Sequence, residues 1–145
     1  MRNKGFTMIE VIVVLAIVGA LSGFVVPKAR HQIAQSKNLE AINILLSLRT
    51  ANALSYIEKN EVMPNGNFST GNLNLLKEYL PDNINKKITE SDNNLTVKIG
   101  GSKNSKGEII YGGNLILIVE NGEIKVNPEP SGGEFNLNGE KWNDI

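Results

Sequence analysis

Residues 6–26 of this chain read FTMIEVIVVLAIVGALSGFVV, an apolar run of 21 residues with one charged side chain, Glu10. As a helix, the run is about 31 Å long at ~1.5 Å per residue, which matches the hydrocarbon core of a bilayer. Arg2 and Lys4 precede the run and Lys28 follows it, so the flanking charges leave its orientation open. The run therefore predicts a helix that spans a membrane.

Two ordinary explanations of this apolar run compete. A secretory signal peptide has a basic start, an apolar stretch and a small-residue cleavage site, for which Val18-Gly19-Ala20 is acceptable. The run is longer than the apolar part of most signal peptides and contains Glu10, which favours a retained transmembrane anchor. A carboxylate costs about 2.5–3.5 kcal/mol at the centre of a bilayer and less near its edge. Glu10 therefore either reaches the interface or pairs with a cation from another chain.

A short basic leader ends in Gly5-Phe6, and Glu10 is the fifth residue after Gly5. This order, followed by a long apolar run, resembles the type IV prepilin signature. The resemblance covers only the amino-terminal end of the chain. It implies that residues 1–5 are a leader that a dedicated membrane peptidase removes, and that Phe6 is then N-methylated.

The resemblance also implies how subunits would assemble. The new amine of Phe6 and the Glu10 carboxylate of a neighbouring subunit would neutralise each other in a filament core. Removing one partner of a buried ion pair strands the other charge, at a cost of several kcal/mol. Gly19 and Gly23 form a small-residue face that allows close helix packing, and Pro27 stands where relatives often have a kink. Relatives lose helical order between such positions in the filament.

Composition limits the chemistry that the chain can perform. The 145 residues fit one domain, or one domain with an appendage. Lys plus Arg and Asp plus Glu both number 15, and this zero net charge argues against phosphate neutralisation over the whole chain. The absence of cysteine excludes disulfides and thiolate sites, and a single histidine, His31, excludes His-pair metal sites. We therefore expect a protein that is not an enzyme and that needs no cofactor.

The chain beyond the apolar run continues with an amphipathic pattern over residues 28–59. We expect one helix over residues 6–59, bent at Pro27. Residues 6–27 would cross the membrane or form the filament core, and residues 28–59 would lie on a globular head, residues 60–145. The apolar positions predicted to face the head are Ile33, Ile42, Leu45, Leu46, Ala53, Tyr56 and Ile57.

The head has the pattern of a small antiparallel sheet. The expected elements are a loop at 60–72, a short helix at 73–80, and strands at 95–99, 109–111, 115–120 and 123–126. Asn121-Gly122 between two apolar segments is a strong hairpin signal, Gly112-Gly113 marks a bulge or turn, and Pro81 ends the short helix. The expected tail anchors are Phe135, Leu137 and Trp142. The fold class is α+β, type IV pilin-like, with a long amino-terminal helix and a small antiparallel sheet.

Two further patterns carry little chemical information. Residues 101–107, GSKNSKG, lack the Gly-Lys-Ser/Thr order and the following helix of a phosphate loop, so a hairpin or surface loop is the better explanation. The acids Asp82, Asp92 and Asp144 are too scattered for a calcium loop. We expect no metal site, although a site built from the asparagine-rich tail stays open.

Together these features indicate a structural subunit of a type IV pilus-like surface filament. The resemblance implies as partners further copies of the chain, related pilins, prepilin peptidase and an assembly platform with its ATPase. It also implies a single-pass precursor in the inner membrane that later joins an extracellular filament. The alternative is a pseudopilin of a type II secretion system or competence apparatus, and a third explanation is a membrane-anchored binding domain. Nothing in the sequence establishes a nucleic-acid partner.

Overall fold

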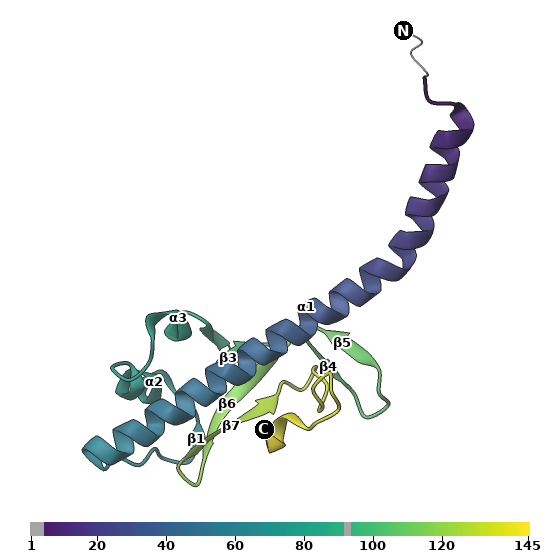
Figure 1. Cartoon of the computed structure of the whole chain (residues 1–145). Coiled ribbons are helices and arrows are strands. Elements are labelled where there is room, and N and C mark those ends of the chain that lie inside the picture. Colours follow the sequence, from purple (N-terminus) through teal and green to yellow (C-terminus); the bar gives the residue numbers. More distant parts are fainter. Residues whose placement is uncertain (1–4, 92–93) are drawn as a thin grey trace. The chain divides into compact units, whose positions relative to one another are not determined.

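The computed structural model describes residues 5–91 and 94–145 (Figure 1). The chain divides into two compact units, Met1–Ile33 and Ala34–Ile145, and each is described by itself. Helix α1 (Met8–Lys59) contributes its first half to one unit and its second half to the other. The second unit also holds all the strands found in the described residues, so the chain has the predicted α+β fold class.

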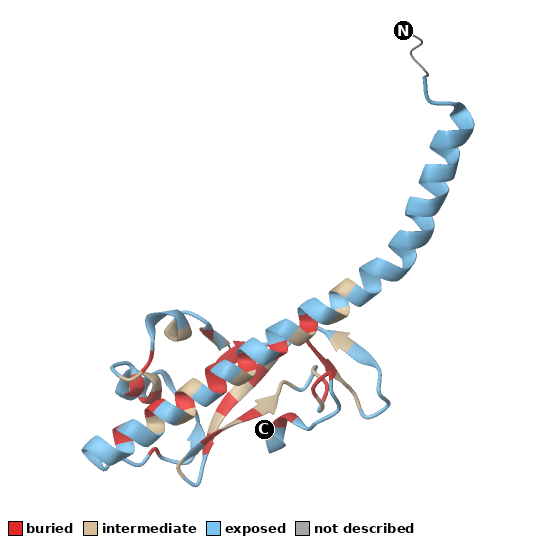
Figure 2. Cartoon of the chain, viewed as in Figure 1, coloured by how far each residue is buried: buried red, intermediate tan, exposed pale blue. Residues whose placement is uncertain are grey.

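The first unit is the apolar half of α1, and its large side chains are exposed (Figure 2). By length and composition α1 can cross a membrane, with a mean hydropathy of 2.6 over its most apolar window. The helix begins at Met8, two residues later than predicted, and continues without interruption through Pro27. A Cβ at Gly19 or Gly23 would meet no atom within 4 Å, so these glycines are open positions within one chain. The bend at Pro27 stays a prediction.

The second half of α1 buries a face different from the predicted one. The buried positions are Ala34, Asn38, Ala41, Ile44, Leu45, Leu48, Ala51 and Ser55. Of the predicted stripe only Leu45 is buried and Ile42 is half-buried, whereas Ile33, Leu46, Ala53, Tyr56 and Ile57 are exposed. The buried positions recur at steps of three or four residues, so they form one helix face on which small and polar residues alternate with Ile44, Leu45 and Leu48. At one end of this face the packing is close, because a Cβ at Gly100 would lie 2.2 Å from the backbone oxygen of Ala34.

The main sheet is antiparallel and is built around β6 (Asn114–Glu120). On one side β6 pairs with β7 (Glu123–Pro128). On the other side it pairs with β1 (Gly66–Asn67) near one end and with β3 (Asn94–Lys98) near the other. The outer strand β2 (Ile88–Ser91) pairs with β3, with Ile88 opposite Val97. The strand pattern places alternate residues of β6, namely Leu115, Leu117 and Val119, in the core.

A second, two-stranded sheet joins β4 (Gly101–Lys103) to β5 (Ile109–Tyr111). Residues 101–107 thus form the start and turn of a hairpin, as predicted, although β4 itself was not predicted as a strand. Gly112 and Gly113, with φ of 80° and 118°, link β5 to β6 and so carry the chain between the two sheets. Glycine adopts this left-handed backbone without the clash that a Cβ causes.

The Asn121-Gly122 turn between β6 and β7 confirms the strongest local prediction. Both residues have positive φ, 55° and 78°, as a type I′ turn requires. Glu120 pairs with Glu123 directly across the turn, and the ladder then continues to Leu115 opposite Pro128. A two-residue turn of this type matches the right-handed twist of the strands, which sets the register of the hairpin.

The short helices differ from the sequence expectation in their bounds. α2 (Thr70–Leu76) begins three residues earlier than predicted, because the Ser69 hydroxyl caps it by accepting from the Asn72 backbone N–H at 3.3 Å. α3 (Asp82–Asn85) follows Pro81 and was not predicted. β2 was also not predicted as a strand. A short 3-10 helix, η1 (Trp142–Asp144), lies near the end of the tail.

The core of the second unit lies between α1 and the main sheet, where Figure 2 shows the buried residues. The tail contributes Trp142, which is fully buried, and Leu137, so two of the three predicted anchors are confirmed. Phe135 is half-buried and instead forms isolated bridges to Lys103 and Lys141. The indole N–H of Trp142 is buried without a hydrogen-bond partner among the described residues.

Candidate functional site

The predicted cleavage position lies at the start of the described chain. Residues 1–4 of the predicted leader lie outside the described residues, whereas Gly5 and Phe6 are both exposed. The Phe6 residue is 84% exposed, and a Cβ at Gly5 would meet nothing within 4 Å. The peptide bond between Gly5 and Phe6 is therefore accessible, which a peptidase requires.

The carboxylate of Glu10 is held by Thr7. Glu10 Oε2 accepts from the Thr7 backbone N–H at 2.8 Å and from the Thr7 hydroxyl at 2.7 Å. The Glu10 backbone N–H in turn lies 3.4 Å from the Thr7 hydroxyl oxygen. This reciprocal arrangement is a capping box, in which Thr precedes Glu by three positions and satisfies amide groups at a helix start.

Thr7 is thus a residue that the sequence interpretation missed, although the Thr-x-x-Glu spacing was a readable signal. The capping box holds the negative charge of Glu10 at the amino terminus of α1, where the helix dipole stabilises an anion. Within one chain the acid therefore has a local, neutral partner. The predicted cationic partner, the Phe6 amine of another subunit, would add to this arrangement.

The remaining predicted assembly residues follow along the same helix. Gly19, Gly23 and Pro27 all lie in the exposed apolar half of α1. In the described part of this half the large apolar side chains, such as Phe24 at 80% exposed, have no cover from the rest of the chain. The Ser22 hydroxyl donates to the Val18 carbonyl oxygen at 2.7 Å, so this polar group has its hydrogen-bond partner within the helix. The surface is suited to lipid or to other apolar helices.

Polar tethers fix the second half of α1 to the sheet, and the sequence did not reveal them. Buried Asn38 donates to the Gly101 carbonyl oxygen at 2.8 Å and accepts from the backbone N–H groups of Gly100 and Gly101 at 2.9 and 3.2 Å. Asn52 donates to the Gly122 carbonyl oxygen at 2.8 Å. These amides satisfy backbone groups that would otherwise be buried unpaired.

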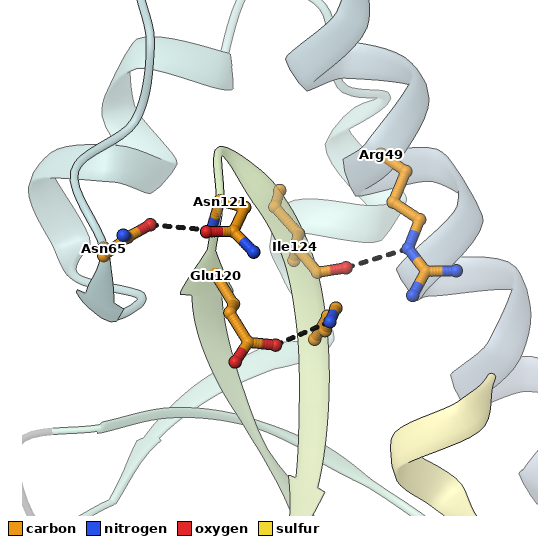
Figure 3. A network of polar contacts seen from close by, with 6 residues as sticks. Arg49, Asn65, Glu120, Asn121 and Ile124 are labelled. Atoms are coloured by element: carbon orange, nitrogen blue, oxygen red, sulfur yellow. Dashed lines mark hydrogen bonds and ion pairs between the residues drawn. The ribbon is translucent and has the colours of Figure 1, made fainter.

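Arg49 is the third tether, and Figure 3 shows its place beside the β6–β7 hairpin. Its Nε donates to the Ile124 carbonyl oxygen at 2.8 Å, and its Nη1 donates to the Ile145 carbonyl oxygen at 2.6 Å. The turn of the hairpin is also joined to the loop before β1, because the Asn121 backbone N–H donates to Asn65 Oδ1 at 2.7 Å. One arginine thus joins α1, a strand and the tail.

The last turn of α1 carries charged side chains that contact the segment after α2. Lys59 forms an ion pair with Glu78, and its ammonium lies 5.5 Å from the centre of the Tyr79 ring. The Tyr79 hydroxyl donates to Glu58 Oε2 at 2.7 Å, and this hydrogen bond raises the pKa of Tyr79 to about 12. The ion pair raises the pKa of Lys59 and lowers that of Glu78. These groups are exposed, so they fix side chains more than they stabilise the fold.

The described residues contain no group of three or more His, Asp or Glu that could hold a metal ion. Asp82 and Asp144 lie on different elements, α3 and η1, and Asp92 lies outside the described residues. His31 is half-buried on α1. The exposed apolar helix with its capped acid is the candidate site.

Comparison with known proteins agrees with this picture. Residues 1–26 match the family model of the prokaryotic N-terminal methylation motif. The type IV major pilin protein PilA of Myxococcus xanthus is 41% identical over 58 residues, which cover 40% of this chain and 26% of that protein. The type IV major fimbrial protein FimA of Dichelobacter nodosus is 27% identical over 134 residues, covering 84% of this chain and 79% of that protein.

A fimbrial protein of Pseudomonas aeruginosa is 31% identical over 61 residues, which cover 42% of this chain and 40% of that protein. The matched stretch thus spans about a quarter of the first of these relatives and less than half of the third. No solved structure matches the chain. The chain is thus similar to type IV pilins in its methylation motif, in its long apolar helix joined to a small antiparallel sheet, and in its sequence.

Proposed function

We propose that this protein is a structural subunit of a type IV pilus-like surface filament. The observation that carries the proposal is an exposed apolar half-helix that begins with a single capped acid, Glu10. Apolar area of this size is stable in water only when another surface covers it. A bilayer covers it before assembly, and other copies of the same helix cover it afterwards.

The first step is processing at the amino end. Prepilin peptidase cuts the exposed bond between Gly5 and Phe6, and the new amine of Phe6 is N-methylated. Before this step the chain is a single-pass precursor in the inner membrane. The match to the N-terminal methylation motif over residues 1–26 supports this order of events.

Polymerisation then uses charge and shape together. The Phe6 amine of one subunit pairs with Glu10 of its neighbour, so that neither charge is left alone in the filament core. Because Thr7 already holds Glu10 in one position, the carboxylate is ordered before the neighbour arrives. Gly19 and Gly23 present no side chain, so neighbouring helices approach closely there, and Pro27 allows the helix to bend.

The partners follow from this sequence of steps. They are further copies of the chain and related pilins, the peptidase, and an assembly platform with its ATPase that extracts subunits from the membrane. The head, residues 60–145 with the second half of α1, forms the filament surface. The role is structural, not catalytic, as it is in the pilins that the chain resembles.

A pseudopilin of a type II secretion system or competence apparatus is the second candidate. The methylation motif covers only residues 1–26, and the same segment would serve either assembly, so the motif supports this candidate as well. A membrane-anchored binding domain that never polymerises is the third.

Shearing of cells of the native host separates these functions. A pilus subunit is recovered in the sheared filaments with Phe6 as its first residue and a mass increased by one methyl group. A pseudopilin stays with the cells but has the same amino terminus. A protein that begins at Met1 in the membrane fraction contradicts both filament functions.

A further inference from the structure

A cavity of about 550 Å³ opens in the second unit. This volume lies within the usual range of small-ligand sites, about 300–1,000 Å³. Its floor contains Ile44 of α1 and Ile99, which are both buried. One wall is Gly112-Gly113, and a Cβ at Gly112 would meet no atom within 4 Å. The cavity is therefore open where the two sheets are joined.

Four lysines line this cavity, and they come from three separate segments. Lys37 belongs to α1, Lys86 and Lys87 lie between α3 and β2, and Lys98 ends β3. The strand register places Ile88, which follows Lys87, opposite Val97, which precedes Lys98. Residues distant in sequence thus converge on one opening.

The positive charge at this cavity is mostly uncompensated. Among the described residues Glu40 is the one carboxylate that lines it, and its partner is Lys87. In the part of the chain that the structure describes, Lys37, Lys86 and Lys98 have no ion pair. Residues 34–145 contain 11 Lys and Arg against 14 Asp and Glu, so a local cationic surplus lies on a unit that is acidic as a whole.

Like charges held close together repel each other, and a bound anion removes this repulsion. Lysine ammonium groups act as mobile point charges with three donors each, which suits the several oxygens of a phosphate. Lys87 is paired with Glu40, whereas Lys37, Lys86 and Lys98 line the cavity without an ion pair in the described residues and are free to contact a ligand. A monovalent anion would leave most of this charge unmatched.

We propose that this cavity binds a phosphate-bearing ligand with two or more negative charges. The inference does not depend on filament assembly, because every residue involved belongs to the second unit. It is also consistent with the zero net charge of the chain, since the cationic surplus is local. Phosphate groups of a small molecule and of a nucleic-acid backbone share this chemistry, and two probes distinguish them.

The test uses the full chain in neutral detergent micelles. Inorganic pyrophosphate is titrated by calorimetry, and a short duplex DNA by fluorescence anisotropy. The cavity variant combines Lys37→Gln, Lys86→Gln and Lys98→Gln, and it spares the ion-paired Lys87. The control variant combines Lys77→Gln, Lys106→Gln and Lys141→Gln, which are also exposed, so both variants lose the same charge. Equal melting temperatures show that both remain folded.

The cavity variant should bind at least about tenfold more weakly than the wild type, whereas the control should change the affinity less than about twofold. Binding of pyrophosphate alone identifies a small phosphate ligand, and tighter binding of DNA identifies a nucleic-acid backbone. The proposal is overturned if the wild type binds neither probe. It is also overturned if the control loses as much affinity as the cavity variant, because the charge of the whole chain would then explain the binding.

Discussion

The two halves of α1 differ in what covers them. In the described residues the first half carries large apolar side chains that are exposed, whereas the second half buries small, polar and large apolar residues in the core of its own head. Leu48 is fully buried, yet Phe24 is 80% exposed on the same helix. The two halves of one continuous helix thus lie in two environments, and the surface that packs on each half determines which residues that half needs.

The difference also shows in how polar groups are used. In the second half, Asn38, Arg49 and Asn52 bind backbone groups of distant segments. In the first half, the polar contacts in the described residues stay within the helix, between Thr7 and Glu10 and from Ser22 to Val18. In the proposed function this half exchanges lipid for other subunits, and polar contacts confined to the half itself allow that exchange.

Removing the first half is the strongest way to test the comparison. A protein that lacks residues 1–27 should move entirely from the membrane fraction to solution, remain monomeric and unfold in one cooperative transition. The reason is that the buried core lies within the second unit. Fractionation, light scattering and thermal unfolding measure this. Persistent aggregation or a disordered spectrum would show that the head depends on the first half.

Substitution of leucine on the two faces of the second half should give the next largest effect. Leu48→Ala removes a fully buried side chain and should lower the free energy of unfolding by about 3 kcal/mol, whereas Leu46→Ala, at an exposed position, should change it by less than about 0.5 kcal/mol. Urea denaturation of the shortened protein measures both. Equal losses would mean that the buried face is assigned incorrectly.

Loss of a polar tether should have a smaller effect. Asn38→Ala leaves two backbone N–H groups and one carbonyl without partners and should lower the free energy of unfolding by about 2 kcal/mol. Asn43→Ala, an exposed asparagine on the same helix, is the matched control and should change it by less than about 0.5 kcal/mol. An Asn38→Ala protein as stable as this control would show that water replaces the tether at no cost.

The smallest effect concerns Tyr79 and pH. Because its pKa is raised from 10.0 to about 12, the protonated phenol stabilises the folded state fully below pH 10. This contribution should decline as the pH rises from 10 through about 12. The difference in phenolate absorbance between the wild type and Tyr79→Phe reports the titration, and Glu58→Gln should lower the measured pKa. If the pKa of Tyr79 is the same in Glu58→Gln, the hydrogen bond to Glu58 is not what raises it.

Local patterns predicted the parts of the fold that local physics determines. The apolar run, the Asn121-Gly122 hairpin and strands β5 and β6 depend on composition, turn chemistry and alternation. β4 and β2 were missed because their sequences, GSK and ITES, are polar or short, and long-range pairing makes them strands. Pairing with a neighbouring strand therefore makes β2 and β4 strands, although their local sequences do not predict it.

The prediction of which face of α1 is buried was also wrong, because tertiary packing decides that face. The prediction selected large apolar residues, but the buried positions follow a different face, from Ala34 through Leu48 to Ser55, at steps of three or four residues. Leu46, Tyr56 and Ile57 consequently lie outside. For the candidate site, the roles of Gly5, Phe6 and Glu10 stay predictions from their spacing, whereas Thr7 was overlooked because the acid was interpreted only toward the membrane interface and toward another chain.

The central claim is that the charge of Glu10 serves a neighbouring subunit as well as its own helix cap. Filament yield after shearing tests it directly when Glu10→Gln and Thr7→Ala are compared in the native host. Glu10→Gln keeps the shape but removes the charge, and it should insert and be cleaved normally while filament yield falls at least about tenfold. Thr7→Ala keeps the charge and loses only the ordering of the carboxylate, so its yield should fall much less than that of Glu10→Gln. Normal yield from Glu10→Gln would contradict the account, and an equal loss from Thr7→Ala would assign the acid to capping alone.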